Sequence, residues 1–282
     1  MQPDQQSPSA PEAVVGERCR ACDAACEPFA TAQVLGHVEA TYERCPSCGL
    51  VMAVRPDWLA EAYSDAIAKL DIGLLDRCQI LSSVTAMVLR SERLRRGRFL
   101  DWAGGYGTLT RMMRDRGYDF VHTDPMATNI FAAGHDVPDL AADDGRRYDL
   151  VTAFEVLEHL SDPVAALTAV AGVTDLLLTT THLVPDPAPQ PADWWYYTLD
   201  SGQHITFYTR AALEVLAERL GFDGVVTGSF VHLFYRGKVS AATRAFVRTP
   251  QASYALGLAA SLADRRHSLL ARDLDEITGR PG

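Results

Sequence analysis

The sequence predicts an α/β fold, an open sheet with helices on both faces that follows a small cysteine-bearing module. Three observations favour this fold. The apolar segment 99–102 runs into a glycine-rich turn that opens a helical pattern, as in a strand–turn–helix unit. Two further apolar segments, 118–124 and 148–154, end at or next to acidic residues. Four N-terminal cysteines stand apart from this pattern in two Cys-x-x-Cys pairs.

The cysteine pairs are separated by 22 residues. Each pair directs two sulfurs at one ion, and two pairs complete a closed tetrahedron with no open position. The pattern predicts one structural Zn ion bound by Cys19, Cys22, Cys45 and Cys48, with Cys26 and His37 as alternative ligands. Because roughly 40 residues bury little apolar surface by themselves, zinc is expected to supply much of the folding free energy of this module.

The glycine-rich turn indicates a pocket for a nucleotide-containing cofactor. Glycines allow a sharp turn and close approach of a ligand, and the amides at the following helix start are free to donate. An acidic residue precedes the glycines, where it would repel a pyrophosphate but could orient a cationic amino group. A purely structural turn is the alternative. The residues concerned are Asp101, Ala103, Gly104, Gly105 and Gly107.

The next two strands supply further candidates at the same edge of the sheet. Asp124 follows the strand at 118–124, where a carboxylate can bind both hydroxyls of a ribose. The alternative role for Asp124 is the N-cap of a helix over 125–131 that begins with Pro125. The third strand delivers Phe154 and Glu155 to this edge, while Glu158 and His159 cap or fix the next helix.

These segments resemble two motifs of the class I S-adenosylmethionine-dependent methyltransferases. Asp101-x-Ala-x-Gly-x-Gly107 is similar to their motif I, with Ala103 where the family often has glycine, and residues 155–160 resemble their motif IV. The resemblance implies a Rossmann-like sheet. It also implies that Asp101, Gly105 and Gly107 hold the methionine part of the cofactor and Asp124 its ribose. By the same resemblance Ala103, Gly104, Pro125, Phe154 and Glu155 contact the cofactor.

Further candidates for cofactor and substrate contacts lie in two other segments. Apolar residues at helical spacing between 58 and 90 predict a helical cap, within which Tyr63 and Arg77 are candidate cofactor contacts. After a fifth strand over 176–181, aromatic and polar residues suit a semi-polar substrate, or else form a hydrophobic plug. These candidate substrate contacts are His182, Trp194, Trp195, Tyr196, Tyr197 and Gln203, and His204 is the candidate catalytic base.

The chain also resembles methyltransferases of sugar and polysaccharide pathways, including the core of the sugar C-methyltransferases. In those enzymes an acid–His pair provides the base, and here Gln203-His204 keeps only the histidine. The expected reaction is therefore methylation of a hydroxyl on a sugar or natural-product precursor. The alternatives are carbon methylation, an RNA methyltransferase, and a binding protein without turnover.

Charge and composition limit the partners. The net charge of −10 disfavours nonspecific nucleic-acid binding, and no apolar run approaches the ~20 residues of a membrane span. No basic and apolar leader is evident, so a cytoplasmic enzyme with a small-molecule substrate is expected, and the C-terminal segment is a candidate homodimer contact. The expected parts are a disordered tail (1–13), a zinc ribbon (14–53), a helical cap (54–96), the methyltransferase core (97–237) and a helical extension (238–282).

Overall fold

The computed structural model describes residues 16–63, 72–137, 140, 145–264 and 267–278. The predicted disordered tail and residues 64–71 of the predicted cap lie outside this part of the chain. Among the described residues, no helix is long and apolar enough to cross a membrane.

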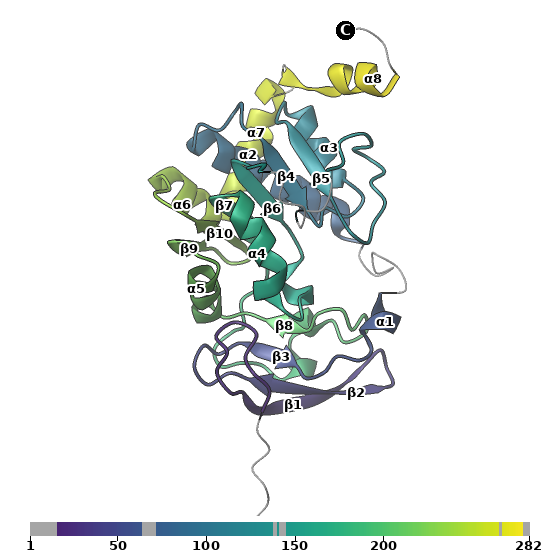
Figure 1. Cartoon of the computed structure of the whole chain (residues 1–282), viewed down its shortest axis with the longest axis vertical. Helices are drawn as coiled ribbons and strands as arrows, with labels where there is room; N and C mark the ends of the chain where they lie inside the picture. Colours follow the sequence, from purple (N-terminus) through teal and green to yellow (C-terminus); the bar gives the residue numbers. More distant parts are fainter. Residues whose placement is uncertain (1–15, 64–71, 138–139, 141–144, 265–266, 279–282) are drawn as a thin grey trace, which may run out of the picture.

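A six-stranded sheet forms the centre of the molecule (Figure 1). Its order is β5-β4-β6-β7-β10-β9. The first four of these strands are parallel, and β10 runs antiparallel to both of its neighbours. The strands are β4 (Phe99–Trp102), β5 (Phe120–Thr123), β6 (Leu150–Ala153), β7 (Leu176–Thr180), β9 (Gly224–Thr227) and β10 (Val231–Tyr235). The predicted α/β sheet is confirmed.

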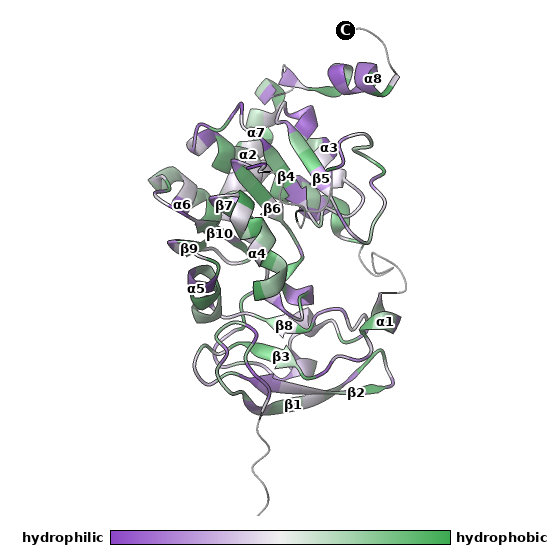
Figure 2. Cartoon of the chain, viewed as in Figure 1, coloured by the Kyte–Doolittle hydropathy of each residue, from purple (hydrophilic) through white to green (hydrophobic). Residues whose placement is uncertain are grey.

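Two apolar cores lie on the two faces of this sheet. Alternate strand residues point to opposite faces, so neighbours such as Phe99 and Leu100 belong to different cores. In Figure 2 apolar colour follows the central strands. One face is covered by α2 (Leu74–Ser91), α3 (Thr108–Asp115) and α6 (Ala241–Arg248), with α7 (Pro250–Asp264) packed on α2. The other face is covered by α4 (Pro163–Val173) and α5 (Arg210–Arg219).

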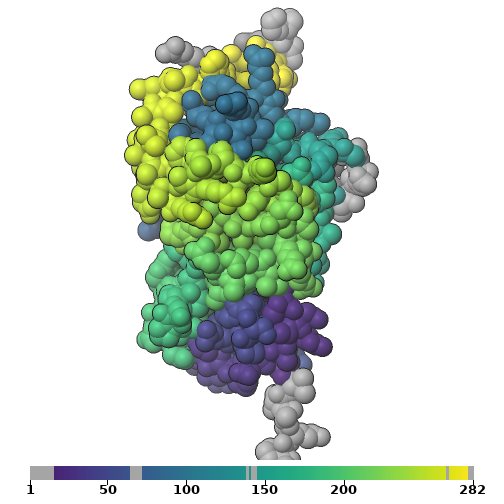
Figure 3. Space-filling model, turned by 90° about the vertical axis from the view of Figure 1, so that its left-hand side faces the viewer, coloured from purple at the N-terminus to yellow at the C-terminus, as the bar shows by residue number. Residues whose placement is uncertain are grey.

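A second sheet joins the N-terminal module to the core. It contains β1 (Glu27–Val34), β2 (Val38–Arg44), β3 (Val51–Ala53) and β8 (Thr206–Phe207), all antiparallel. The first three strands come from the module, whereas β8 comes from the segment that follows His204. Figure 3 shows the N-terminal residues, in purple, packed beneath the later green part of the chain.

The predicted helical cap takes a different form. Helix α1 (Leu59–Ala62) is short and lies against the second sheet, while α2 packs mainly on the central sheet. Leu81, Val84 and Leu89 of α2 are buried beside Phe99. The apolar spacing therefore identified a helix correctly, but most of α2 is a core helix and only its first turns reach the candidate site.

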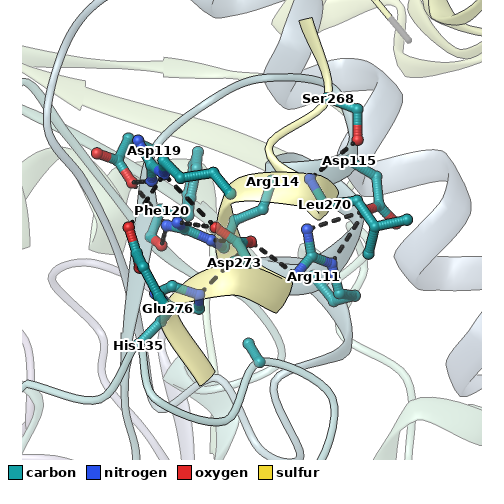
Figure 4. Close-up of polar contacts among 12 residues, drawn as sticks. Arg111, Arg114, Asp115, Asp119, Phe120, His135, Ser268, Leu270, Asp273 and Glu276 are labelled. Atoms are coloured by element: carbon teal, nitrogen blue, oxygen red, sulfur yellow. Dashed lines mark hydrogen bonds and ion pairs between the residues drawn. The ribbon is translucent and has the colours of Figure 1, made fainter. Parts of the chain in front are cut away.

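Helix α8 (Leu270–Thr278) is attached to the core by one buried carboxylate (Figure 4). Asp273 accepts two hydrogen bonds from Arg114 (2.7 and 2.8 Å) and one from Arg111 (2.8 Å). Arg114 is 1% exposed, and its guanidinium also donates to the Phe120 carbonyl. Burial opposes ionisation of Asp273, but the hydrogen bonds from Arg114 and Arg111 outweigh it and lower the pKa to about 2.

We predict that Asp273→Ala releases α8 and lowers the free energy of unfolding by about 3 kcal/mol, because it removes the carboxylate that accepts from the buried Arg114 and the partly buried Arg111. Asp275→Ala on the same helix is the matched control. In the wild type, the lowered pKa means that the stabilisation is present above about pH 4, near the pKa of an unfolded Asp, and is lost as the pH falls toward 2. Amide exchange of α8 at pH 6 and pH 3 measures this; equal protection of α8 in wild type and Asp273→Ala would contradict it.

Candidate functional site

The candidate site lies at the carboxyl ends of β4 and β6. The chain leaves β4 toward β5 on one side and returns to β6 on the other, and ligands of open α/β sheets bind at such a switch point. The residues that leave these two strands have unusual backbones. Ala103 has φ of 55° and Glu155 has φ of 54°, a left-handed conformation that costs energy in residues other than glycine. Strain at two adjacent strand ends supports a functional edge.

The glycine-rich turn is fixed to the end of β5 by Asp124. One carboxylate oxygen accepts from the Gly105 amide (2.8 Å), and the other accepts from the amides of Met126 and Ala127 (both 2.7 Å). Pro125 is exposed. The described residues 125–131 contain no helix, so the alternative role of Asp124 as a helix N-cap is wrong; it closes a turn instead. A side chain on Gly105 would meet nothing within 4 Å, which leaves open space above the turn for a ligand.

Asp101 lies beneath this turn. It is 2% exposed and accepts hydrogen bonds from Thr110 (3.0 Å) and Thr152 (2.8 Å). Burial outweighs these bonds and raises the pKa of Asp101 to about 6. Its carboxylate is 2.5 Å from where a side chain on Gly104 would begin. Asp101 thus supports the turn from below, and any direct contact with a cofactor remains a prediction.

At the end of β6, Glu155 pairs with another predicted cofactor residue, Arg77. Its carboxylate accepts from the Thr180 hydroxyl (2.8 Å) and pairs with the Arg77 guanidinium (3.2 Å) from the first turn of α2. Both side chains are about one-third exposed, at 35% each. Phe154 packs against the core of the α2 face. The structure therefore brings Arg77 to the strand edge that carries Glu155.

A second cluster lies beside Glu155 and contains Glu158, His159 and His204. One possible ligand atom from each lies within 4.8 Å of the others. The Tyr63 hydroxyl is 2.8 Å from Nδ1 of His159, and the Gln203 carbonyl is 3.0 Å from the same atom. Burial, with the charge of Glu155, raises the pKa of Glu158 to about 8. Burial, with the neighbouring His159, lowers the pKa of His204 to about 3, so its imidazole is neutral near pH 7.

Glu158 was not among the candidates for this site. The sequence interpretation gave Glu158 and His159 to the cap of the next helix, but Asp162 is the N-cap of α4, where its side chain accepts from the Ala165 amide. The signal that could have identified Glu158 is its place next to His159, three residues after Glu155. A 3₁₀ turn (Leu157–His159) directs the two residues toward the 203–204 segment.

The N-terminal module positions His204. Arg20, between the first two cysteines, donates to the Ile205 carbonyl (2.7 Å) and the Thr206 hydroxyl (2.6 Å). The Gln203 amide donates to the Ala62 carbonyl (2.8 Å), and the Trp58 indole donates to the Gly202 carbonyl (2.8 Å). The backbone on both sides of His204 is therefore held by residues of the predicted ribbon and cap.

The aromatic residues 194–197 fall into two groups: one is part of the hydrophobic core, and the other lies beside the histidine cluster. Tyr197 is 1% exposed and packs on Phe207, and Trp194 packs on Tyr197, which agrees with the hydrophobic-plug interpretation at these positions. Tyr196 is buried with its ring 4.6 Å from that of His204 and 4.8 Å from that of His182. Trp195 is 69% exposed beside His182, with ring centroids 5.1 Å apart. His182, Trp195 and Tyr196 thus form one wall next to the histidine cluster.

The four cysteines fit zinc. The sulfurs of Cys19 and Cys48 are 3.5 Å apart and those of Cys22 and Cys45 are 3.4 Å apart, close to the separation of about 3.8 Å expected around a tetrahedral zinc ion. Cys26 lies outside this group of four. His37 is in the β1–β2 turn, with its ring near Leu35 and Glu61, so the alternative ligand sets are not needed.

The glycine-rich turn at the switch point and the wall of histidine and aromatic side chains lie at the same edge of the central α/β sheet, where enzymes of this architecture bind their ligands. Comparison with known proteins identifies the family to which the domain belongs. Residues 77–227, more than half of the chain, match the methyltransferase domain family, and the chain belongs to that family. The expectation of a methyltransferase is thereby confirmed at the level of the domain family. A search of the curated proteins finds no match.

Several solved structures are similar to part of this chain at low identity. The SAH-bound CalO1, a methyltransferase of calicheamicin biosynthesis, has 17% identity and a TM-score of 0.42, over 63% of this chain and 61% of CalO1. Human N-acetylserotonin methyltransferase with SAM has 16% identity and a TM-score of 0.44, over 64% and 66% of the two chains. A family 2 O-methyltransferase from Planctomyces limnophilus in complex with apigenin has 16% identity and a TM-score of 0.45, over 64% and 65%.

We predict that Cys45→Ser removes the thiolate-to-cobalt absorption of the cobalt-loaded chain and the amide protection of β3 and β8, because the tetrahedral site loses a ligand. Cys78→Ser, a cysteine of α2 outside the group of four, is the control and keeps both signals. An unchanged cobalt spectrum in Cys45→Ser would rule out the four-thiolate site.

We predict that Ala103→Gly raises the free energy of unfolding by up to about 1 kcal/mol, because glycine adopts the left-handed backbone without the cost that alanine has there. Ala165→Gly, at an exposed position in α4, should lower it by about 1 kcal/mol. Urea unfolding measures both; a destabilised Ala103→Gly would show that the backbone at this position is not strained.

Proposed function

We propose that this chain transfers a methyl group from S-adenosylmethionine to a hydroxyl of a small molecule, a sugar or a natural-product precursor. The proposal rests on one observation: the glycine-rich turn of a methyltransferase domain and a wall of histidine and aromatic side chains lie at the same edge of the central sheet.

The cofactor half of the proposal rests on the residues around β4, β5 and β6. The open space above Gly105 and the carboxylate of Asp124 suit a nucleoside, and the half-buried Glu155 extends the same edge. S-adenosylmethionine supplies a methyl group already activated on a sulfonium. The protein therefore has to bind, orient and exclude water more than it has to perform covalent chemistry.

The acceptor half rests on the Glu158–His159–His204 cluster and its aromatic wall. His204 Nδ1 lies 2.7 Å from the Tyr196 carbonyl, which can only accept, so Nδ1 carries the proton and Nε2 carries the lone pair. The cluster is thus suited to receive the proton of an acceptor hydroxyl. His182 and Trp195 offer flat, semi-polar surfaces of the kind that bind sugar or phenolic rings.

Oxygen is favoured over carbon as the methylated atom. Gln203 occupies the position of the acid in the sugar C-methyltransferase pair, and its amide is engaged with the Ala62 carbonyl. A neutral, half-buried His204 that is preceded by Gln203 instead of an acid is better matched to a hydroxyl than to the much less acidic proton of a carbon. RNA is a weaker candidate, because the chain is acidic overall.

We predict that S-adenosylhomocysteine binds the zinc-loaded wild type with micromolar affinity and that Asp124→Ala weakens this binding by roughly 10- to 100-fold. This is the loss expected when hydrogen bonds to a charged group are removed. Calorimetric titration measures the affinity. Asp149→Ala, whose carboxylate accepts a backbone amide at the opposite end of β6, is the matched control.

In the same titration His204→Ala keeps its affinity for S-adenosylhomocysteine within about twofold, because His204 is assigned to the acceptor half. The absence of binding by the folded wild type would overturn the proposed function. Equal binding by wild type and Asp124→Ala would overturn the assignment of the ribose site.

A further inference from the structure

We propose that Glu158, His159 and His204 form a binding site for a divalent transition-metal ion, separate from the four-cysteine site. One nitrogen from each histidine and one carboxylate oxygen lie within 4.8 Å of one another. Two imidazoles and one carboxylate are a common ligand set for Zn²⁺, Mn²⁺ and Fe²⁺. The ligands come from two segments, the turn after β6 and the irregular segment that leads into β8.

The hydrogen bonds of both histidines suit metal ligands. His204 Nδ1 donates to the Tyr196 carbonyl (2.7 Å), since a backbone carbonyl can only accept, so the lone pair of this ring is on Nε2. His159 Nδ1 lies 3.0 Å from the Gln203 carbonyl and 2.8 Å from the Tyr63 hydroxyl, and the carbonyl favours the same tautomer in this ring. Metal-binding histidines characteristically donate their other ring N–H to a carbonyl or carboxylate, which fixes the tautomer and the ring orientation.

Glu158 gives the second, independent observation. It is fully buried, and neither carboxyl oxygen has a hydrogen-bond partner among the described residues. A buried carboxyl group without partners costs free energy that a bound cation would offset. The Tyr196 hydroxyl, which packs nearby, is engaged with the Thr181 hydroxyl at 3.2 Å.

The other histidine–carboxylate cluster of the described residues does not share these features. His135, Asp273 and Glu276 also place ligand atoms close together (Figure 4). The Asp273 carboxylate, however, already accepts from Arg111 and Arg114. Two guanidinium groups at the same oxygens repel a cation, so this cluster serves to anchor α8.

Three protein ligands leave positions open for water or an acceptor oxygen. The inference deepens the proposed function, because an ion here would hold an acceptor hydroxyl beside the aromatic wall and acidify it. In the transfer, the C–S bond of the sulfonium breaks, the new C–O bond forms, and the thioether leaves neutral. With the ion bound, His204 is a metal ligand rather than the base, and the hydroxyl proton passes to solvent water. The acceptor class is then a molecule whose hydroxyl can ligate a metal, such as a sugar diol or a phenol.

The test counts metal in the full-length chain. After equilibration with Zn²⁺ and removal of free ion, elemental analysis should find about two zinc ions per wild-type chain and about one in Glu158→Gln and in His204→Ala. The retained ion is the thiolate-bound one. His135→Ala, in the cluster that anchors α8, is the matched control and keeps two.

A titration with Mn²⁺ isolates the second site, because hard Mn²⁺ competes poorly for a four-thiolate zinc site. The wild type is first loaded with one zinc ion, in the four-cysteine site. Loss of the free Mn²⁺ signal in electron paramagnetic resonance should then report one Mn²⁺ site in wild type and none in Glu158→Gln. One zinc per wild-type chain with no Mn²⁺ binding overturns the proposal, as does a count of two that Glu158→Gln and His204→Ala both leave unchanged. S-adenosylhomocysteine binding is measured separately, so failure of the metal site and failure of the methyltransferase assignment are distinguishable.

Discussion

The pairing of β3 with β8 is the constraint on which the candidate site depends. Met52 is in register with Thr206, and the Ala53 amide donates to the Ile205 carbonyl at 2.9 Å. On the other side, the Ile205 amide donates to the Glu158 carbonyl at 2.8 Å. The short 203–207 segment is therefore held between the N-terminal module and the turn after β6. Both segments of the acceptor cluster take their positions from this arrangement.

The four-cysteine site is connected to the candidate site through this sheet. Arg20, within the first Cys-x-x-Cys pair, donates to Ile205 and Thr206, and the second pair leads directly into β3. The Cys48 carbonyl accepts from the hydroxyl of Thr209, which in turn is the N-cap of α5. A metal ion held by the four cysteines would therefore help to fix the 203–207 segment without offering an open coordination position of its own.

The sequence predicted the elements whose signals are local. The strand–turn–helix unit at 99–115, the ends of β6 and β7, and the four cysteines all appear where their patterns indicated. Contacts between segments that are distant in the chain could not be predicted from the sequence. No pattern in the sequence shows that Thr206 and Phe207 complete the second sheet. Nor does one show that Arg114 is buried against Asp273, or that the apolar face of α2 packs on the central sheet. These depend on tertiary packing, which overrides spacing and charge as local indicators.

The second sheet, formed by β1, β2, β3 and β8, also affects how the chain folds. Its fourth strand is supplied by the core, and Arg20 and its partner Ile205 are 185 residues apart in sequence. Contacts of such long separation carry a large loop-closure cost and slow folding. During synthesis, the cysteine knuckles emerge long before β8, so the module stays incomplete at one edge until most of the core has left the ribosome. The N-terminal module is therefore a poor candidate for transplantation as an independent unit.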